Sequence, residues 1–387
     1  MLSSYTADLH IHIGRDMYFA PVKITASNRL TLTAILREAS INKGIDMIGV
    51  VDCQAPAVLR ELKQLIIQGE AKELQEGGIR FDSVTLLLGS EIEVNDAKGQ
   101  GPIHVLCYFP QIHQMEIFSE WLSLRMKNIS LSSQRFYGSA KELQWKVKDL
   151  QGVFIPAHIF TPFKSLYGKG VLRSLSEILS PDLIDGMELG LSADTQMADQ
   201  IEELHSFTYL TNSDAHSLGK FAREYQHMQM KHPSFKEFQF VLANKNGRKI
   251  QNNYGMNPKL GKYYRTVCSQ CLTYLTVEKS VCPNCHSKKH VKGVADRIAD
   301  LKDADELCSS RPDYTYQVPL EYLPGIGKRT YEKLLKSFGT EMHIIHQTTR
   351  EKLALVVSEQ IAQAIIDMRN GELHVQEGGG GKYGFIK

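Results

Sequence analysis

The chain has 387 residues, 42% of them hydrophobic, which is long enough for two or more domains and typical of a globular protein, not a fibrous or disordered one. It contains neither an apolar run of about 18 residues nor an N-terminal signal pattern, so we expect no membrane contact and a cytoplasmic location. Residues 1–219 hold 19 Lys and Arg against 26 Asp and Glu, and residues 220–387 hold 26 against 17, which together give the net charge of +2. A basic half suits nucleic acid, although differently solvated surfaces produce the same asymmetry.

The first predicted strand, residues 7–13, carries polar side chains on alternate positions. Asp8, His10 and His12 share one face of such a strand, and the Leu and Ile residues between them share the other. A single His on a strand is more often a hydrogen-bonded residue than a ligand. Two His residues two positions apart beside an Asp favour a metal site.

Further short apolar strands follow at regular intervals. They are predicted at residues 46–52, 84–94, 102–109, 152–159, 185–190 and 208–216. Helical patterns lie between most of them, including residues 32–44 and residues 55–77, where Pro56 opens the helix and Gly77 and Gly78 end it. Alternating strands and helices predict an α/β fold of parallel units, and about seven units suggest a barrel related to the eight-unit kind.

Most of these strands end in side chains that can bind a metal. Besides His10 and His12, these are Asp52, Glu91, His104, His158, Asp214 and His216. The carboxyl ends of barrel strands meet at one rim, so we expect these side chains to converge. The set exceeds what one tetrahedral ion needs and predicts two or three divalent ions, with zinc expected and Mn, Mg or Fe as alternatives. Such a cluster can hydrolyse a phosphate ester.

Five motifs within residues 1–225, "DLHIH", "GSEIEV", "PIHVLCYF", "IPAHIF" and "NSDAH", occur in this order. They resemble the successive metal-binding motifs of the polymerase and histidinol phosphatase (PHP) family of phosphoesterases. The resemblance implies a distorted seven-stranded barrel with a multinuclear metal centre. It also implies the ligand set His10, His12, Glu91, His104, His158, Asp214 and His216. In this set Glu91 would bridge two ions, and Glu91, Asp214 and His216 are the predicted catalytic residues.

The second motif departs from the family, which commonly has His where this chain has Cys53. Cys53 is either a thiolate ligand or a small core residue, and Asp52 is the alternative ligand. Asp16 lies just beyond the first motif and is predicted as a further ligand. Asp8 is expected either to orient a His or to touch metal.

Four cysteines in the rear half, Cys268, Cys271, Cys282 and Cys285, form two CxxC pairs ten residues apart. Either pair alone could be a redox site. Two pairs this close together predict a closed structural zinc site with four thiolates, in a small zinc ribbon. Lysines around it could contact a phosphate backbone or be solvated surface residues.

The segment "LEYLPGIGKRTYEKLL", residues 320–335, resembles the helix-hairpin-helix, a non-specific DNA-binding unit. Gly325 and Gly327 would let backbone N–H groups approach a phosphate at the start of the next helix, where Lys328 and Arg329 add charge. A plain helical hairpin with a glycine turn is the alternative. The Gly-rich tail, residues 376–387, could dock on a replication or repair partner or on the protein itself.

The order of these parts resembles the endonuclease Q family. We divide the chain into a barrel (1–250), a connector with the zinc ribbon (251–295), an all-α helix-hairpin-helix domain (296–375) and the tail. The resemblance implies cleavage of DNA on the 5′ side of deaminated bases (hypoxanthine, uracil, xanthine) and at abasic sites. Three aromatic residues that could contact an extruded base, or simply pack a loop, are Phe160, Phe163 and Tyr167. The alternatives are a phosphatase of a small phosphate monoester and a non-catalytic DNA-binding adaptor.

Overall fold

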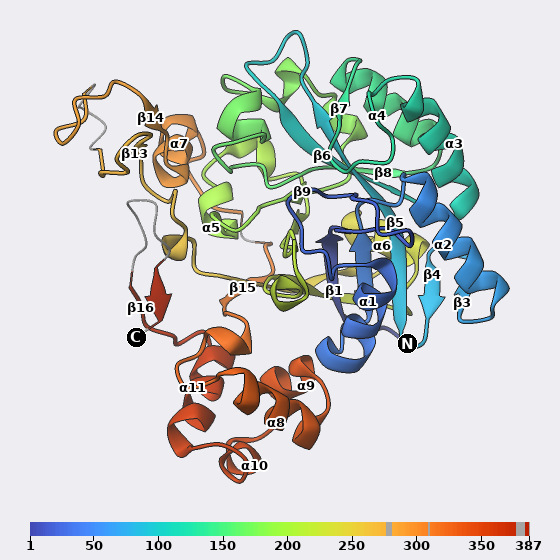
Figure 1. Cartoon of the computed structure of the whole chain (residues 1–387). Coiled ribbons are helices and arrows are strands. Elements are labelled where there is room, and N and C mark those ends of the chain that lie inside the picture. The colour runs from blue at the N-terminus through green and yellow to red at the C-terminus, as the bar shows by residue number, and fades with distance from the viewer. Residues whose placement is uncertain (276–280, 309, 377–383, 387) are drawn as a thin grey trace.

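The structure is a computed structural model that describes residues 1–275, 281–308, 310–376 and 384–386. Figure 1 shows a sheet with covering helices, a small extension at the upper left that holds β13, β14 and α7, and a helical module of α8 to α11 below. The helices are α1 (Leu32–Arg37), α2 (Pro56–Ile67), α3 (Ile112–Ser123), α4 (Ala140–Asp149), α5 (Thr195–Ala198), α6 (Phe235–Leu242), α7 (Val294–Leu301), α8 (Lys328–Phe338), α9 (Glu341–His346), α10 (Arg350–Ala354) and α11 (Glu359–Arg369). Among these described helices, none combines the length and the apolar character needed to cross a membrane.

Eleven of the described strands belong to one mixed sheet. They are β1 (Ser3–Ile11), β2 (Met47–Val50), β3 (Ala71–Glu73), β4 (Ile79–Phe81), β5 (Val84–Val94), β6 (Ile103–Phe109), β7 (Arg135–Phe136), β8 (Val153–Pro156), β11 (Tyr225–Met230), β12 (Lys249–Gly255) and β15 (Asp313–Tyr316). Three separate pairs are β9 (Met187–Glu188) with β10 (Tyr209–Leu210), β13 (Val267–Cys268) with β14 (His290–Val291), and β16 (Val375–Gln376) with β17 (Phe385–Ile386). The mixed α/β architecture agrees with the predicted fold class.

The sheet is not a continuous run of parallel βα units, which corrects the prediction. The pairs β1 with β2 and β2 with β5 are parallel, but β5 with β6 and β6 with β8 are antiparallel. Only residues 95–102 connect β5 to β6. A parallel crossover needs a dozen or more residues, so this short connection forces the antiparallel pairing.

Backbone hydrogen bonds bring the short strands β9 and β10 into the same assembly. Asp185 N donates to Phe154 O at 3.0 Å, beside β8. His12 N donates to Ala215 O at 3.1 Å, and Ala215 N donates to His10 O at 3.0 Å, so the chain beyond β10 lies against β1. These contacts bring together the ends of strands that are far apart in the sequence, while the seven-strand barrel count stays a prediction.

The two predicted helices have different outcomes. Residues 32–43 are helical, as α1 followed by a π-helical turn over Glu38–Lys43. The helix predicted at 55–77 starts at Pro56 but ends at Ile67, because Gly69 takes a left-handed φ of 76° and turns the chain into the β3–β4 hairpin. Gly77 and Gly78 form the turn of that hairpin and do not end a helix.

The helical module is joined to the sheet by buried polar contacts. Lys43 forms a salt bridge with Glu341 of α9, and these side chains are only 4% and 2% exposed. Glu341 also accepts hydrogen bonds from the Tyr331 hydroxyl at 2.8 Å and from Leu320 N at 3.1 Å. Nearby, the Tyr225 hydroxyl lies 2.7 Å from His346 Nε2. The module is therefore fixed against the sheet at more than one point.

Candidate metal centre

The structure brings six predicted ligands together as two groups of three. One group is His10, His12 and Asp214, and the other is Glu91, His104 and His158, with the ligand atoms of each group within 4.8 Å of one another. They come from β1, from the segment after β10, from β5, from β6 and from the segment after β8. Strands far apart in the sequence thus deliver their polar ends to one place, as the strand-end pattern predicts.

Glu91 lies between the two groups. Its Oε1 is 2.8 Å from His104 Nδ1 and 3.4 Å from both His158 Nε2 and His10 Nε2. Its Oε2 is 3.5 Å from His12 Nε2. A carboxylate whose two oxygens face imidazoles of both groups is placed as the predicted bridge between two ions would be.

The ligand atoms themselves fit a metal better than they fit a hydrogen-bond network. His10 Nε2, His12 Nε2 and Asp214 Oδ1 are buried, and none has a hydrogen-bond partner within the described residues. The two nitrogens lie 3.5 and 3.4 Å from that oxygen. Buried polar atoms without partners are costly, so imidazole and carboxylate atoms converging in this way suit divalent cations.

Backbone strain occurs at the centre. His158 and Asp214, neither of them glycine, have positive φ values of 32° and 44°. Gly190 follows β9 with a φ of 76°, and a Cβ there would stand 2.7 Å from the Cβ of His158. Strained residues persist only where the surroundings impose them and cluster at functional sites, so this strain is consistent with a ligand-holding role.

A second layer of acids orients the histidines. Glu188 Oε1 lies 2.9 Å from His10 Nδ1. The same carboxylate accepts hydrogen bonds from His158 N and Asn212 Nδ2, both at 2.8 Å. The Asp52 Oδ2 atom lies 3.2 Å from His12 Nδ1 and accepts from Ile13 N at 2.7 Å. Carboxylates on the far nitrogen of a ligating His are typical of metal sites.

Two of these observations change the sequence-based ligand set. Asp52, predicted as a ligand, holds His12 instead of joining either group. Glu188 was missed, although it ends the predicted strand 185–190 and the strand-end rule would have selected it. The Asp8 carboxylate accepts hydrogen bonds from Ser213 N at 3.1 Å and Ala222 N at 2.9 Å. It therefore holds backbone in place and does not join either ligand group.

Asp16 and Cys53 are not brought to the centre. Asp16 accepts hydrogen bonds from Tyr18 N and Ala20 N, both at 2.9 Å, and so shapes a loop. Cys53 is fully buried in the hydrophobic core, its thiol donates to Val50 O at 3.2 Å, and burial raises the pKa of that thiol. Neither residue belongs to the two ligand groups, so a ligand role for Asp16 stays a prediction, and for Cys53 the structure favours the small core residue.

The electrostatics of the centre keep its acids ionised. Burial alone would raise the pKa of Glu91, but His104 and Lys23 hold that pKa well below its usual value. Burial would likewise raise the pKa of Asp214, but His10 and His12 hold it well below the ordinary range. Anionic carboxylates are the form that binds cations.

A cavity of about 530 Å³ opens from this centre to the surface. The candidate ligands Glu91, His104, His158, Asp214 and His216 line it, together with Lys23 and Ser133. His216 stands outside the two groups, but its Nδ1 lies 3.5 Å from Asp214 Oδ1 and its ring is 4.8 Å from that of His12. The predicted catalytic residues Glu91, Asp214 and His216 thus face one accessible space.

The three predicted DNA-contacting aromatic residues do not behave alike. Phe160 and Tyr167 are 1% and 0% exposed and stack on each other at 5.4 Å, so the structure favours the alternative of loop packing for these two residues. Tyr167 N bonds to Ile159 O, which folds this loop back on itself. Phe163 is half exposed, lines the 530 Å³ cavity and lies edge-on to Tyr263 at 5.5 Å.

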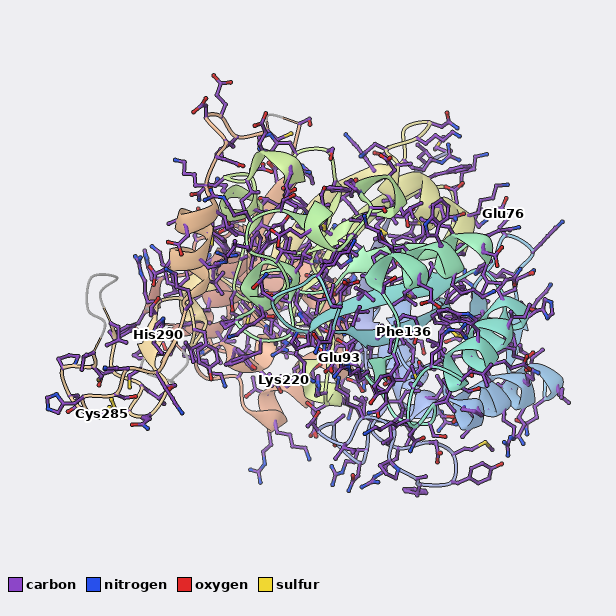
Figure 2. The ribbon with its side chains drawn as sticks, turned by 90° about the horizontal axis from the view of Figure 1, so that it is seen from above. Glu76, Glu93, Phe136, Lys220, Cys285 and His290 are labelled. Atoms are coloured by element: carbon purple, nitrogen blue, oxygen red, sulfur yellow. The ribbon has the colours of Figure 1, made fainter. Side chains whose placement is uncertain are left out.

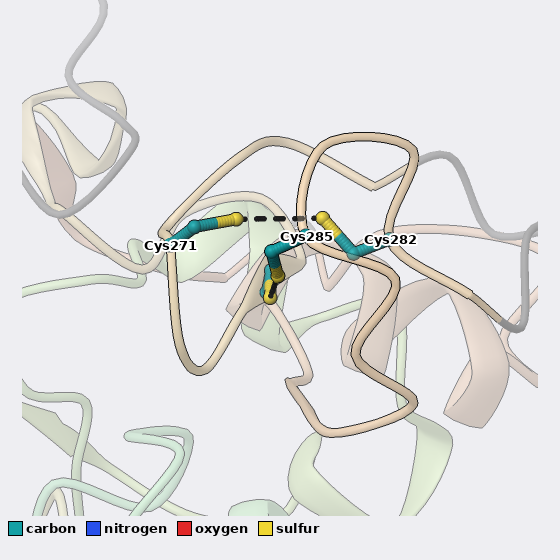
Figure 3. Close-up of side chains that lie close together, drawn as sticks. Cys271, Cys282 and Cys285 are labelled. Carbon is teal, nitrogen blue, oxygen red and sulfur yellow. Dashed lines mark hydrogen bonds between the residues drawn. The ribbon is translucent and has the colours of Figure 1, made fainter.

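The four cysteines form a second, separate cluster. Figure 3 labels three of them, Cys271, Cys282 and Cys285. Cys268 Sγ is 3.5 Å from Cys285 Sγ, Cys271 Sγ is 3.4 Å from Cys282 Sγ, and all four thiols are free. Sulfurs bound to one zinc ion at about 2.3 Å stand about 3.8 Å apart in a tetrahedron, so this set fits zinc. The hydroxyl and backbone N–H of Thr273 lower the pKa of Cys271 to about 5, which favours a thiolate ligand.

Each cysteine pair is held by its own tight turn. Leu272 N donates to Cys268 O and His286 N donates to Cys282 O, both at 3.0 Å, and both donor residues have a left-handed backbone. Figure 2 shows Cys285 and His290 at one end of the molecule, well apart from Glu93, which neighbours the barrel centre. The cluster is thus built locally and lies away from the cavity.

The predicted hairpin of the helical module presents its glycines to solvent. Gly325, Gly327, Lys328 and Arg329 are exposed, whereas Ile326 between them is buried. Gly325 has a φ of 86°, and Gly327 begins α8 without a side-chain cap. The first N–H groups of α8 therefore face outward, as an anion site requires.

Part of the predicted tail, residues 377–383, lies outside the described residues. The described end contacts the protein itself: β17 pairs with β16, and Gly384 N donates to Leu260 O at 3.0 Å. Phe385 lines a cavity of about 460 Å³ with Met256, Val318 and Tyr322. Docking on a replication or repair partner stays a prediction.

Comparison with known proteins identifies relatives over the whole chain. No protein-family model matches it. The Bacillus subtilis (strain 168) protein YqxK is 50% identical over 381 residues, which cover 98% of each chain. The crystal structure of the lesion-specific endonuclease PfuEndoQ from Pyrococcus furiosus has a TM-score of 0.86 and 33% identity, over 100% of this chain and 95% of that one. The crystal structure of Endonuclease Q in complex with a 27-mer duplex substrate carrying an abasic lesion at the active site has a TM-score of 0.85 and 33% identity. The match covers 100% of this chain and 96% of that one. The chain therefore belongs to the endonuclease Q family.

Proposed function

We propose that the protein is a DNA repair endonuclease that hydrolyses the phosphodiester on the 5′ side of deaminated bases and abasic sites. The observation that carries the proposal is the pair of adjoining ligand groups at the base of an open cavity. Membership of the endonuclease Q family supports a DNA substrate, since one family member was crystallised with an abasic duplex.

In this proposal His10, His12 and Asp214 would hold one ion, His104 and His158 would hold a second, and Glu91 would contribute to both sites. The chemistry that divalent ions supply when bound in such a set is activation of a nucleophilic water and neutralisation of phosphate charge. Glu188 and Asp52 fix the imidazoles through hydrogen bonds of 2.9 and 3.2 Å. Glu91, Asp214 and His216 are assigned the catalytic contacts because all three line the cavity that a phosphate would enter.

The extruded nucleotide is proposed to enter the 530 Å³ cavity, with the edge of its base reaching into a smaller cavity of about 100 Å³ beside the centre. His158 and Asp214 form its inner wall, and Ser192, Lys262 and Tyr263 form its outer part. The Ser192 hydroxyl and the Lys262 ammonium are donors that suit a base carbonyl, which every deaminated base carries in place of an amine. An abasic nucleotide would enter the same space without that contact.

The rear half is proposed to hold the duplex. The four cysteines would bind a structural zinc in a ribbon within residues 251–295, and the exposed hairpin of residues 296–375 would bind DNA phosphates at the start of α8. Residues 1–250 form the proposed catalytic barrel. The sheet itself crosses these divisions, because β12 continues to Gly255 and β15 adds to it.

The test is a matched set of labelled duplexes that carry inosine, uracil, an abasic site or no lesion. We expect lesion-dependent nicking 5′ of the lesion by the metal-loaded wild type, and none by Asp214→Ala or in strong chelator. Release of phosphate from histidinol phosphate without nicking would favour a small-molecule phosphatase. Tight binding of the duplexes without nicking would favour a DNA-binding adaptor.

A further inference from the structure

The loop between β1 and α1 places one lysine inside the candidate metal centre. Lys23 N donates to Ile13 O at 2.8 Å and Val22 N donates to Gly14 O at 3.1 Å, so the loop folds back along the end of β1. The Lys23 side chain is 14% exposed, and its Nζ lies 3.0 Å from Glu91 Oε2 and 2.6 Å from Ser133 Oγ. An ammonium group is thus held within the cavity wall, next to the proposed bridging carboxylate.

This ammonium shares its carboxylate with the proposed ions. Glu91 faces four imidazoles as well as Lys23, and its Oε2 also accepts a hydrogen bond from the Ser133 hydroxyl. Cations bound by Glu91 would draw on the same negative charge that balances Lys23. The largely buried Lys23 ammonium would then lack a fully compensating anion, and the negative charge of an entering phosphodiester would pair with it.

The other lysine of the cavity, Lys164, is already paired with a different acid. Lys164 lines the same space, but its Nζ lies 2.7 Å from Glu93 Oε2 and its side chain is 48% exposed. Glu93 is outside both ligand groups and would not be drawn away by an ion. Between the two lysines of this wall, Lys23 is therefore the one placed to contact the reacting phosphate.

We propose that Lys23 is a catalytic residue whose ammonium donates a hydrogen bond to an oxygen of the scissile phosphate. This role rests on the proposed function and adds to it a fixed positive charge supplied by the chain itself. A donor preorganised in a poorly hydrated site stabilises charge that develops on phosphate more than charge already present in the substrate. Lys23 should then affect the rate of cleavage more than the binding of DNA.

The test compares Lys23→Met, Lys23→Arg and Lys63→Met with the wild type. Lys63 is the matched control, because it pairs with Glu116 on the outer surface between α2 and α3. We expect Lys23→Met to slow single-turnover cleavage of an abasic duplex by about 10²–10³-fold, with a change of less than about tenfold in the Kd for that duplex. Lys23→Arg should restore much of the rate, and Lys63→Met should match the wild type.

Two further readouts separate this role from a structural one and from failure of the proposed function. Metal content, measured by mass spectrometry, should be equal in wild type and Lys23→Met. Inorganic phosphate near neutral pH carries the second negative charge that the diester acquires only during cleavage, so titration with it should show weaker binding to metal-loaded Lys23→Met, whether or not any DNA is cut. Loss of metal from Lys23→Met, equal phosphate affinity or an unchanged cleavage rate would each overturn the inference. A wild type that binds phosphate but cuts no lesion would overturn only the proposed function.

Discussion

The two candidate metal sites are assembled in opposite ways. The centre of the two ligand groups, which we call the barrel centre after the proposed barrel, takes its ligands from positions between 10 and 214, and nearly all of them are buried. The cysteine cluster takes all four ligands from residues 268–285, and each pair is shaped by its own turn. One site is made by the fold of a large domain, whereas the other can be made by a short segment alone.

This difference implies opposite couplings between metal and folding. The barrel centre sits on strands with an extensive hydrophobic core, so the strands need no metal to keep the ligands together. The described residues around the cysteine cluster offer only the two-residue strands β13 and β14 and little core of their own. Small modules of this kind depend on their metal for folding. Chemistry should therefore belong to the first site and stability to the second.

The largest expected effect is on catalysis at the barrel centre. Asp214→Asn removes the charge of a proposed ligand that contacts His10 and His12, and it leaves the strands and core in place. We expect cleavage of a lesion duplex to fall by about 10³-fold or more, since removing one member of a catalytic set disables the set. The melting temperature should change little.

Asp16→Asn is the matched control, because Asp16 is a nearby buried acid that only bonds loop backbone. Its cleavage rate should stay within about tenfold of the wild-type rate. A larger loss is what the removal of a group that supports a metal site would cause, because such removals typically cost about 10–100-fold. Equal losses in the two variants would show that Asp16 is a ligand after all.

The next effect is on local folding at the cysteine cluster. Cys282→Ser removes one of four thiolates, so we expect zinc to be lost and hydrogen exchange to become fast in residues 266–275 and 281–292. Exchange in β5, which carries Glu91, should stay slow. Mass spectrometry of exchanged peptides measures both regions in one sample.

Fast hydrogen exchange in β5 of Cys282→Ser would contradict the independence of the two sites. That result would show that folding of the barrel depends on the cysteine cluster. Cys107→Ser is a suitable control, since Cys107 is buried in β6 and is not part of either candidate site.

A smaller effect is expected from the acid behind His10. Glu188→Gln keeps the shape of the side chain but weakens its hold on His10 Nδ1 and His158 N. Loss of such a supporting acid typically lowers metal affinity by about 10–100-fold. Competition with a chelator measures this, with Glu177→Gln, far from the centre in a surface turn, as the control.

The last expected effect is on stability between about pH 4.5 and pH 8. Glu224 is fully buried, and burial, partly opposed by a hydrogen bond from Met256 N, raises the pKa of its carboxyl to about 8. Because the folded pKa exceeds the unfolded value near 4.5, the stabilisation is complete below pH 4.5 and is lost as the pH rises through 8. The slope is at most about 1.4 kcal/mol per pH unit.

Glu224→Gln should remove this slope, so the variant should gain stability relative to the wild type between pH 5 and pH 8. Thermal unfolding across that range measures it. The stability of the cysteine cluster should not fall over the same pH range, since higher pH favours the thiolate form of its ligands. Parallel pH profiles in the two proteins would contradict the burial-based pKa of Glu224.

Sequence patterns predicted the metal centre well where one strand carries the signal. His10 lies in β1 and His12 directly follows it, Glu91 and His104 lie in β5 and β6, and His158 lies two residues beyond β8. Spacing alone also identified the cysteine set, because its ligands are local. What spacing does not determine is which side chain of a strand end faces the ions, and this is why it left the choice between Asp52 and Cys53 open.

Other errors arose where tertiary contacts override local pattern. Gly69 turns the chain after α2, and the predicted helix ends there. The loop after β8 folds back through the Tyr167 N to Ile159 O bond, and this buries Phe160 and Tyr167. Lys23 offers no pattern at all, since its place beside Glu91 depends on how a 20-residue loop returns to β1.

The buried salt bridge between Lys43 and Glu341 has a mechanical consequence. Leaving either charge of such a pair buried without its partner costs about 3–5 kcal/mol, so the pair resists any movement that separates the two side chains inside the joint. If the hairpin binds DNA as proposed, the helical module would do so from a fixed position, and the protein would set the distance from the hairpin to the proposed site of cutting. A duplex that engages both would have to adapt its own curvature, which makes easily bent, poorly stacked DNA the better fit.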